Sequence, residues 1–157
     1  MLRGTLSLIW ILALVLAMAS SALAADNGAI NTTQTYQGQT ESFTDTLFCS
    51  EKLYNITVTY NGVEHMTILP NGGITVTETE TGTFTAVPAD GTGPSYSGKF
   101  TFWSGGLLKP DDTGAFTFTI TIHGMGSDGT DLQVHATFHD NANPNTERAF
   151  QKIMHCP

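Results

Sequence analysis

The sequence predicts an all-β fold, a single antiparallel meander of eight or nine strands closed into a small barrel, with a β-sandwich as the alternative. Apolar and polar residues alternate with a period of two over most of the chain, and a helical period is confined to a short stretch around residues 147–153. Turn residues separate the alternating stretches at short intervals. A meander of this length leaves two unpaired edges unless it closes, so we expect a barrel.

The first 24 residues read as a secretory signal peptide. A positive start is followed by an apolar run, Leu6–Ala19, and by the small residues Ser20–Ala24. The run is short for a permanent membrane anchor, which is the alternative. We therefore expect a secreted, extracellular protein with three parts: residues 1–24 as signal peptide, a polar flexible leader at 25–38, and one barrel domain at 39–157.

The first predicted strands follow the leader. An early strand covers Ser42–Phe48, and the next two are separated by corners at Tyr60-Asn61-Gly62 and Pro70-Asn71-Gly72. A three-residue loop with glycine in the left-handed position suits both corners and keeps apolar residues on one face. The expected cross-strand pairs are Ile56 with Met66, Met66 with Val76, and Ile68 with Ile74.

Threonine marks the next stretch, where it occupies every second position from 75 to 85. A period of two places all of these side chains on one side of an extended backbone, and β-branched residues favour strands. Glu80-Thr81-Gly82 could also form a further corner, with glycine left-handed.

The remaining strands alternate in the same way. Tyr96, Phe100 and Phe102 share one face, and Ile122 is expected opposite Leu132, so that the apolar residues of both strands lie on that face. The last predicted strand is Ala149–His155.

The chain has only two cysteines, and they would end the first and last strands. A bond between Cys49 and Cys156 would tie the seam of a closed barrel, since secretion supplies an oxidising environment. Two free thiols, or a bridge between molecules, are the alternatives.

Several stretches resemble a group of small secreted bacterial all-β proteins of unassigned function. They are "TYNGVEHMTILPNGG", "TGTFTAVPADGTGPSYSGKF", "HGMGSDGTDLQVHATFH" and the closing Phe150-x-Lys152-x-x-x-Cys156. The resemblance implies secretion and an all-β fold. It implies no reaction, cofactor or catalytic residue.

Composition excludes some partners. The net charge of −8 argues against binding to nucleic acid and against binding to anionic membrane surfaces. No second long apolar run follows the signal peptide, so no membrane association is expected after cleavage. The chain also lacks a Gly-x-Ser-x-Gly elbow, a phosphate loop and a dinucleotide motif, and no cofactor is expected.

Three groups of residues could still carry chemistry. His135 and His139 are four apart on a strand, about 13 Å, which is too far for one metal ion, so we expect them and His123 to be polar residues on the Thr-rich face. Glu78 and Glu80 would share a face about 7 Å apart, a separation that suits acid–base hydrolysis of a glycosidic bond. The loops "PDDTG" and "GSDGTD" could bind calcium weakly, but Asp and Gly are also ordinary turn residues.

The aromatic residues are the last group. Most of them should point inward, where they form either a solid core or the wall of a ligand cavity. Trp103 falls on the opposite face and could mark a binding rim. The predicted ligand-binding residues are Tyr54, Phe100, Phe102, Trp103, Phe116, Phe118 and Phe138.

Taken together, these features favour a secreted, non-catalytic protein with a binding or structural role. One alternative is an extracytoplasmic carrier of a small apolar ligand in the barrel lumen. The other is a hydrolase that uses Glu78 and Glu80.

Overall fold

The computed structural model describes residues 28–47 and 50–142, and the backbone of a last strand at 149–155. The predicted signal peptide and both cysteines lie outside the described residues. No helix long and apolar enough to cross a membrane occurs in the described part of the chain.

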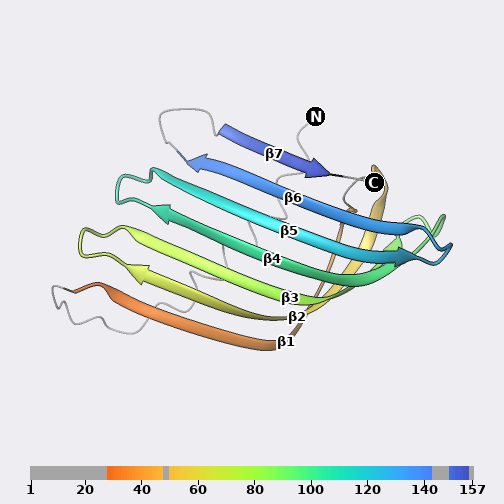
Figure 1. Ribbon diagram of the computed structural model, residues 1–157, viewed down its shortest axis with the longest axis horizontal. Helices are drawn as coiled ribbons and strands as arrows, with labels where there is room; N and C mark the ends of the chain where they lie inside the picture. Colours follow the sequence, from red (N-terminus) through yellow and green to blue (C-terminus); the bar gives the residue numbers. More distant parts are fainter. Residues whose placement is uncertain (1–27, 48–49, 143–148, 156–157) are drawn as a thin grey trace.

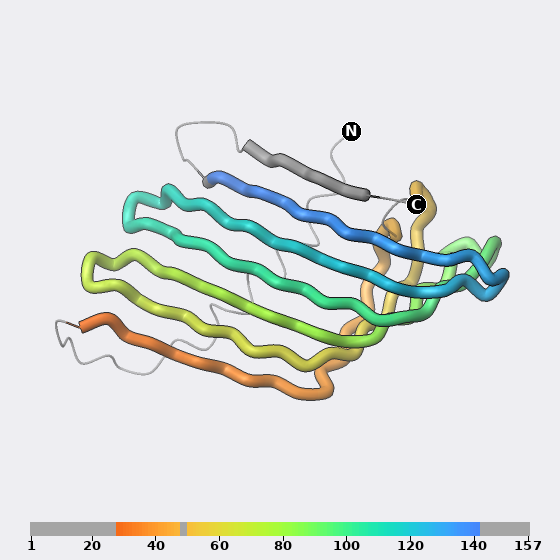
Figure 2. The backbone as a smooth tube through the Cα atoms, in the orientation of Figure 1, coloured from red at the N-terminus to blue at the C-terminus, as the bar shows by residue number. Residues whose placement is uncertain are grey.

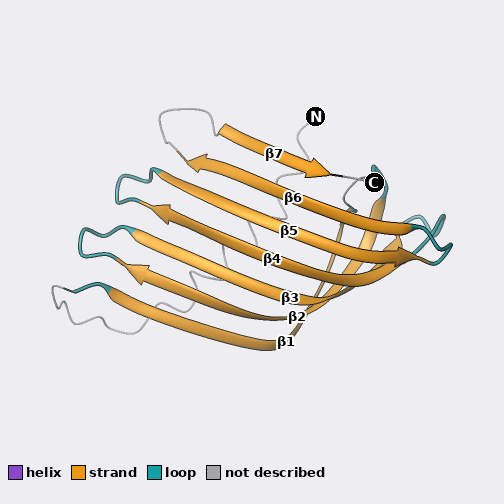
Figure 3. Ribbon diagram, viewed as in Figure 1, coloured by secondary structure: helices purple, strands orange, loops and turns teal. Residues whose placement is uncertain are grey.

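Seven antiparallel strands form one sheet in sequence order, which confirms the predicted all-β meander (Figure 1, Figure 3). The described residues form seven strands, so the predicted count of eight or nine is not confirmed. Along the described residues β1 pairs with β2 alone and β7 with β6 alone, so the sheet is open and closure into a barrel is not confirmed. The strands are β1 (Ile30–Thr46), β2 (Leu53–Ile68), β3 (Ile74–Pro88), β4 (Tyr96–Leu108), β5 (Gly114–Gly126), β6 (Asp131–Ala142) and β7 (Ala149–His155).

The strand count falls because two predicted corners are interior parts of long strands. Tyr60-Asn61-Gly62 lies within β2 and Glu80-Thr81-Gly82 within β3. Gly62 stays in the ladder, paired with Tyr36 on one side and Glu80 on the other. The predicted pairing of Ile56 with Met66 is therefore wrong, and Ile56 instead lies between Phe43 and Ala86.

The leader was also mispredicted in part. β1 begins at Ile30, so residues 30–38 are strand and not flexible leader. Their backbone pairs with the end of β2, from Gly62 to Ile68. The polar side chains carry no apolar signal, but pairing with neighbouring β2 satisfies the backbone groups on one side of this edge strand.

Three hairpin loops of the described residues share one design, two at one end of the sheet and one at the other. In each, the residue before a three-residue loop donates its N–H to the carbonyl oxygen of the residue after it, as in Leu69 N–H to Gly73 O at 2.7 Å. Its own carbonyl oxygen accepts from the third loop residue. The third loop residue is left-handed: Gly72 (φ 83°), Asp112 (φ 61°) or, at the opposite end of the sheet, Gly129 (φ 85°). The Pro70-Asn71-Gly72 loop and its pairs Ile68–Ile74 and Met66–Val76 are confirmed.

The same loop geometry corrects the predicted register between β5 and β6. Ser127-Asp128-Gly129 is the turn, and Gly126 N–H bonds to Thr130 O at 2.7 Å. Ile122 consequently pairs with Val134, and Leu132 pairs with Gly124. The predicted pairing of Ile122 with Leu132 was wrong by two residues, which leaves every side chain on its predicted face.

The sheet curls strongly, and the first two strands bend most (Figure 1, Figure 2). A β-bulge interrupts β1 between Tyr36 and Gln39, where Gly38 has a φ of 62° and donates its N–H to Asn61 Oδ1 at 2.8 Å. A bulge bends and twists its strand. Because of the bend, the last part of β1 and the first part of β2 run across the other strands (Figure 1).

We call the concave side the inner face; it carries Tyr54, Phe84, Phe100 and Val134, among others. The opposite side, the outer face, carries the threonines at odd positions from 75 to 85, together with Trp103 and His135.

The core lies on the inner face, at the end where the curl brings β2 over β6. Tyr54 and Ile56 from β2 pack in one cluster with Leu132, Val134 and Ala136 from β6. Tyr54 also meets Tyr96 edge to face, with ring centroids 6.0 Å apart. Each buried large side chain contributes roughly 1.5–3 kcal/mol, so this cluster fastens the curl. The other members are Leu47, Phe84, Ala86, Phe100 and Ile122.

Candidate functional site

The inner face beyond the core carries a group of tyrosines and carboxylates. We call Tyr36, Tyr60, Glu41, Glu64, Glu78 and Glu80 the Tyr–Glu cluster. They come from three adjacent strands, β1, β2 and β3. Glu64 and Glu78 are directly paired across strands, and Glu80 is paired with Gly62.

Gly62 decides where the Tyr36 ring lies. A Cβ atom built on Gly62 would overlap the ring carbons of Tyr36, so the ring lies across β2 over the glycine. From this position the Tyr36 hydroxyl, which belongs to β1, reaches carboxylates on β3. It donates to Glu78 and lies 3.3 Å from Glu80 Oε1. The missing side chain is thus what lets a tyrosine span an intervening strand.

The second tyrosine completes the group. Tyr60 donates its hydroxyl to Glu41 Oε1 at 2.6 Å. The rings of Tyr36 and Tyr60 meet edge to face, with centroids 5.9 Å apart and planes at 88°. Each tyrosine therefore braces the other while its hydroxyl holds a carboxylate.

The crowding of carboxylates changes their proton affinity. Partial burial, and then the charge of neighbouring Glu78, raise the pKa of Glu80 from 4.5 to about 7, although the Tyr36 hydrogen bond opposes this. Partial burial and Glu78 also raise the pKa of Glu64. Burial and the hydrogen bonds to carboxylates raise the pKa of both tyrosines, so both keep their protons and remain donors.

An apolar surface continues beside the Tyr–Glu cluster on the inner face. Phe116, Phe118 and Phe138 are half-buried, and the Phe118 and Phe138 rings lie 6.4 Å apart. Phe102 and Ile120 are also partly exposed, where they pack against the core. No described strand covers this end of the concave inner face (Figure 1), and we call this uncovered part of the face the trough. Apolar side chains and carboxylates share it.

The predicted ligand-binding residues fall into three places. Tyr54 and Phe100 are buried in the core, at 3% and 9% exposure. Phe102, Phe116, Phe118 and Phe138 line the open trough. Trp103 lies on the outer face, as predicted, and is 44% exposed.

The histidines lie on the outer face, as the sequence predicted. Thr121 and Thr117 hydroxyls lie 3.0 Å from the Nδ1 atoms of His135 and His139. No group of three or more potential ligands among His, Cys, Asp and Glu could hold a metal ion in the described part of the chain.

The Asp-rich loops use their carboxylates within the turns. Asp111 Oδ1 accepts the Thr113 N–H at 3.1 Å, and Asp128 Oδ1 accepts the Thr130 N–H at 3.0 Å. Asp90 accepts from Thr92 in the same way, at 2.9 Å. The Thr113 hydroxyl, and then the Thr113 N–H, lower the pKa of Asp111. The backbone hydrogen bonds, and then the threonine side chains, lower the pKa of Asp90 and Asp128. The loops that were candidates for calcium thus have an ordinary turn role.

Sequence reasoning found Glu78 and Glu80 but missed four members of the Tyr–Glu cluster. Tyr36 fell within the predicted leader, and Tyr60 within a predicted corner. The alternation of Gln34 and Tyr36 with β-branched Thr33 and Thr35 is a strand signal that could have extended β1. The reach of Tyr36 across Gly62 carries no sequence signal.

Comparison with known proteins adds no relative: no family model, no curated protein and no solved structure matches the chain.

Proposed function

We propose that the chain is a secreted, non-catalytic protein that holds a small amphipathic ligand in the trough of its inner face. The observation that carries this proposal is the placement of the Tyr–Glu cluster on the same face as half-buried Phe116, Phe118 and Phe138, with β4 between them. The phenylalanines suit an apolar body, and the carboxylates suit a positively charged head. This refines the predicted carrier of a small apolar ligand, because the trough also offers charge.

Secretion is part of the proposal. Residues 1–24 act as a cleaved signal peptide, and the mature chain works outside the cytoplasm, where small amphipathic molecules need a carrier. Detection of the mature chain in culture medium, with its amino terminus at Ala25, tests this part separately.

Barrel closure is the structural part of the proposal. Cys49 and Cys156 form a disulfide that fastens the edge near the end of β1 to the end of β7. Two contacts support this: Leu47 belongs to the same core cluster as Ala136, and Ala136 pairs with Met154 of β7. Each cysteine is two residues beyond one of these positions.

Displacement of a neutral fluorescent probe, N-phenyl-1-naphthylamine, tests the ligand site. At pH 8, where Glu80 is mostly ionised, octyltrimethylammonium should displace the probe at least about tenfold more effectively than octanoate, because the two ligands carry head groups of opposite charge on apolar chains of similar length. Phe118→Ala should weaken both ligands. Glu78→Gln combined with Glu80→Gln should remove the preference for the cation.

The control is Thr119→Ala, which changes the outer face of the same strand as Phe118 and should leave both ligands unaffected. Failure of the wild-type protein to take up the probe, or equal displacement by the two ligands, would contradict the proposal.

A hydrolase is the second candidate, supported by the unequal environment of two carboxylates on one strand. Near neutral pH Glu80 retains a proton, as a general acid must, beside a second carboxyl group on Glu78. The predicted separation of about 7 Å is not kept, because both carboxylates accept from the Tyr36 hydroxyl and therefore lie closer together than the range of inverting glycosidases. Hydrolysis of chromogenic glycosides that disappears in both Glu78→Gln and Glu80→Gln would favour this function over simple binding.

A further inference from the structure

A tryptophan lies flat on the outer face of the sheet. The trough is on the inner face, so the tryptophan belongs to a separate surface. Trp103 is 44% exposed. A Cβ atom built on Gly105 would come within 2.8 Å of Cη2 and Cζ2 of the Trp103 ring. The indole therefore lies along its own strand, over the bare backbone of Gly105, with its outer surface open to solvent.

Hydroxyl groups flank this ring on both sides. In the sheet register Trp103 lies between Thr79 and Thr119, and Gly105 lies between Thr77 and Thr117. Cross-strand contacts orient part of this set: the hydroxyls of Thr119 and Thr137 are 3.2 Å apart. Along each strand the hydroxyls recur at about 7 Å, and between strands at about 5 Å.

Charge is almost absent from this surface. On the outer-face positions of β3, β4 and β5, Lys99 is the one Lys, Arg, Asp or Glu residue. The carboxylates Glu41, Glu64, Glu78 and Glu80 belong to the inner face, and among the described strands Asp131, at the start of β6, is the outer-face carboxylate. A strongly acidic protein thus presents one face that is nearly neutral and rich in hydroxyls.

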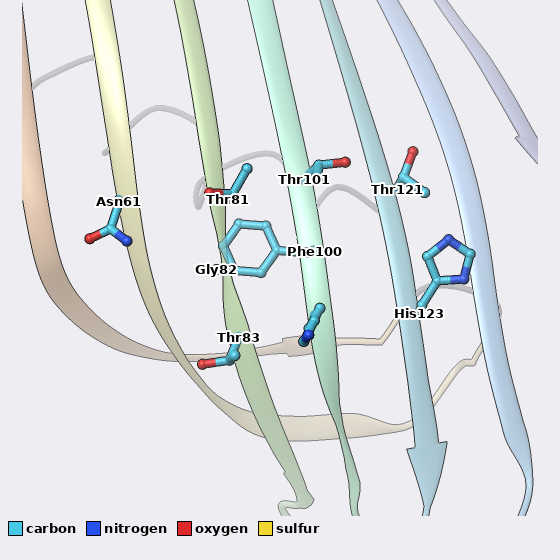
Figure 4. A pocket seen from close by; sticks show the side chains of 9 residues that line it. Asn61, Thr81, Gly82, Thr83, Phe100, Thr101, Thr121 and His123 are labelled. Atoms are coloured by element: carbon cyan, nitrogen blue, oxygen red, sulfur yellow. The ribbon is translucent and has the colours of Figure 1, made fainter.

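A shallow open depression of about 370 Å³ extends the same surface toward the bend of the sheet. Thr101, two residues before Trp103, belongs to its lining, which crosses from β2 to β5 (Figure 4). The polar side chains that line it are Asn61, Thr81, Thr83, Lys99, Thr101, Thr121 and His123. They provide amide, hydroxyl, ammonium and imidazole groups on the same face as the indole, on the side of Trp103 away from Gly105.

We propose that the outer face is a docking surface for a neutral polysaccharide chain, with Trp103 as its stacking platform. A pyranose ring has an apolar face of C–H groups and a rim of hydroxyls. An exposed indole matches the apolar face, and rows of threonine hydroxyls match the rim. A nearly uncharged surface suits a neutral polymer, and an acidic polymer would gain little from a single lysine.

Retention of the secreted full-length protein on microcrystalline cellulose, chitin and a neutral β-glucan tests this proposal, with carboxymethylated cellulose as the anionic counterpart. The wild-type protein should be retained by at least one neutral polymer. Trp103→Ala should weaken this retention at least about tenfold, because an aromatic anchor dominates such a surface. Gly105→Ala should also weaken it, since the added methyl group pushes the indole off the sheet while leaving the tryptophan in place.

Met125→Ala is the matched control, since Met125 is a 59% exposed apolar residue on the same face, and it should bind like the wild type. Circular dichroism should show that all three variants are folded. Three outcomes would overturn the proposal: no retention on any neutral polymer, retention on the anionic polymer alone, or equal retention of wild type and Trp103→Ala. The Glu78→Gln, Glu80→Gln variant should bind the polymer normally, which separates this surface from the trough.

Discussion

At the scale of single residues, Gly62 and Tyr36 define the chemistry of the inner face. Glycine within a strand weakens the strand, since it adds no side chain to the packing. Here the space above Gly62 is filled by the Tyr36 ring, which carries a proton donor to two carboxylates. The loss of packing at one residue is thus offset by a contact from the adjacent strand.

Replacing Tyr36 with phenylalanine should raise the pKa of Glu80 above its value of about 7. The Tyr36 hydrogen bond stabilises the ionised carboxylate, so its removal favours the protonated form. Gly62→Ala should act in the same direction, because it displaces the ring while keeping the hydroxyl. Carboxyl-carbon NMR titration of Glu80 measures both shifts, with Gly28→Ala as a control. A pKa of Glu80 that falls or stays constant in both variants would contradict the role of Tyr36.

Glu80 should make the protein less stable as the pH rises. Its pKa is about 7 when folded and 4.5 ordinarily, so the folded state binds more protons. The stability that this proton supplies is complete below pH 4.5 and is lost as the pH rises to about 7. After allowance for solvent screening of a half-buried group, the loss is roughly 1–2 kcal/mol.

Urea unfolding from pH 4.5 to 8 measures this effect as the difference between wild type and Glu80→Gln, whose side chain does not titrate. Glu51→Gln, a change at an exposed position before β2, is the control and should keep the wild-type slope. Parallel stability curves for wild type and Glu80→Gln would exclude a proton held by Glu80.

At the scale of elements, repeated loops set the register of the sheet. Three loops place an Asn or Asp at the second position, where its side chain accepts a backbone N–H from the residue two positions later. The same three loops place a left-handed residue third. The sequence predicted the Pro70-Asn71-Gly72 loop because proline and glycine are specific signals. It did not predict the register after Gly126, because several Gly, Ser and Asp residues there allow more than one turn.

The left-handed third position predicts opposite effects of two substitutions. Asp112→Gly should stabilise the protein by about 0.5 kcal/mol, because glycine adopts this conformation without the steric cost that aspartate bears. Gly72→Ala should destabilise it by about 1 kcal/mol for the converse reason. Thermal unfolding measures both changes. If Asp112→Gly destabilised the protein, the Asp112 side chain would contribute more free energy to folding than its left-handed backbone costs.

The elements also show where alternation misleads. Faces were predicted correctly for β3 to β6, because a period of two survives a shift in register by two residues. The ends of the strands were not predicted correctly, because Asn61-Gly62 and Thr81-Gly82 are turn sequences that remain extended inside β2 and β3. Each of these strands has a paired neighbour on both sides, and those ladder hydrogen bonds override the local turn preference.

At the scale of the whole molecule, the curl separates two surfaces of different chemistry. The inner face holds the core, the trough and the Tyr–Glu cluster, and the outer face holds threonines, histidines and one exposed indole. A flat sheet would expose both faces equally. The curl buries one end of the inner face through contacts between β2 and β6 and leaves the other end open.

The proposed bridge between Cys49 and Cys156 should stabilise the curled form. A crosslink that encloses about a hundred residues contributes roughly 4–5 kcal/mol in the chain-entropy model. Cys49→Ser combined with Cys156→Ser should therefore lower the free energy of unfolding by several kcal/mol. Urea unfolding under oxidising conditions measures the loss, and mass spectrometry of the protein without reduction identifies the bridge.

A reduced wild-type sample is the control, and it should unfold like the double variant. Two unmodified thiols in protein recovered from an oxidising compartment would contradict the bridge and, with it, closure of the sheet into a barrel.

The sequence by itself determined the all-β class, the strand faces, the Pro70-Asn71-Gly72 turn and the position of Trp103 on the outer face. All of these follow from alternation and from turn residues, which act over a few neighbouring positions. Only the tertiary structure decided the length of β2 and β3, the start of β1 and the reach of Tyr36 to Glu78 and Glu80. These depend on pairing with strands distant in sequence and on a glycine that leaves room for a neighbour's ring, and local patterns do not encode such contacts.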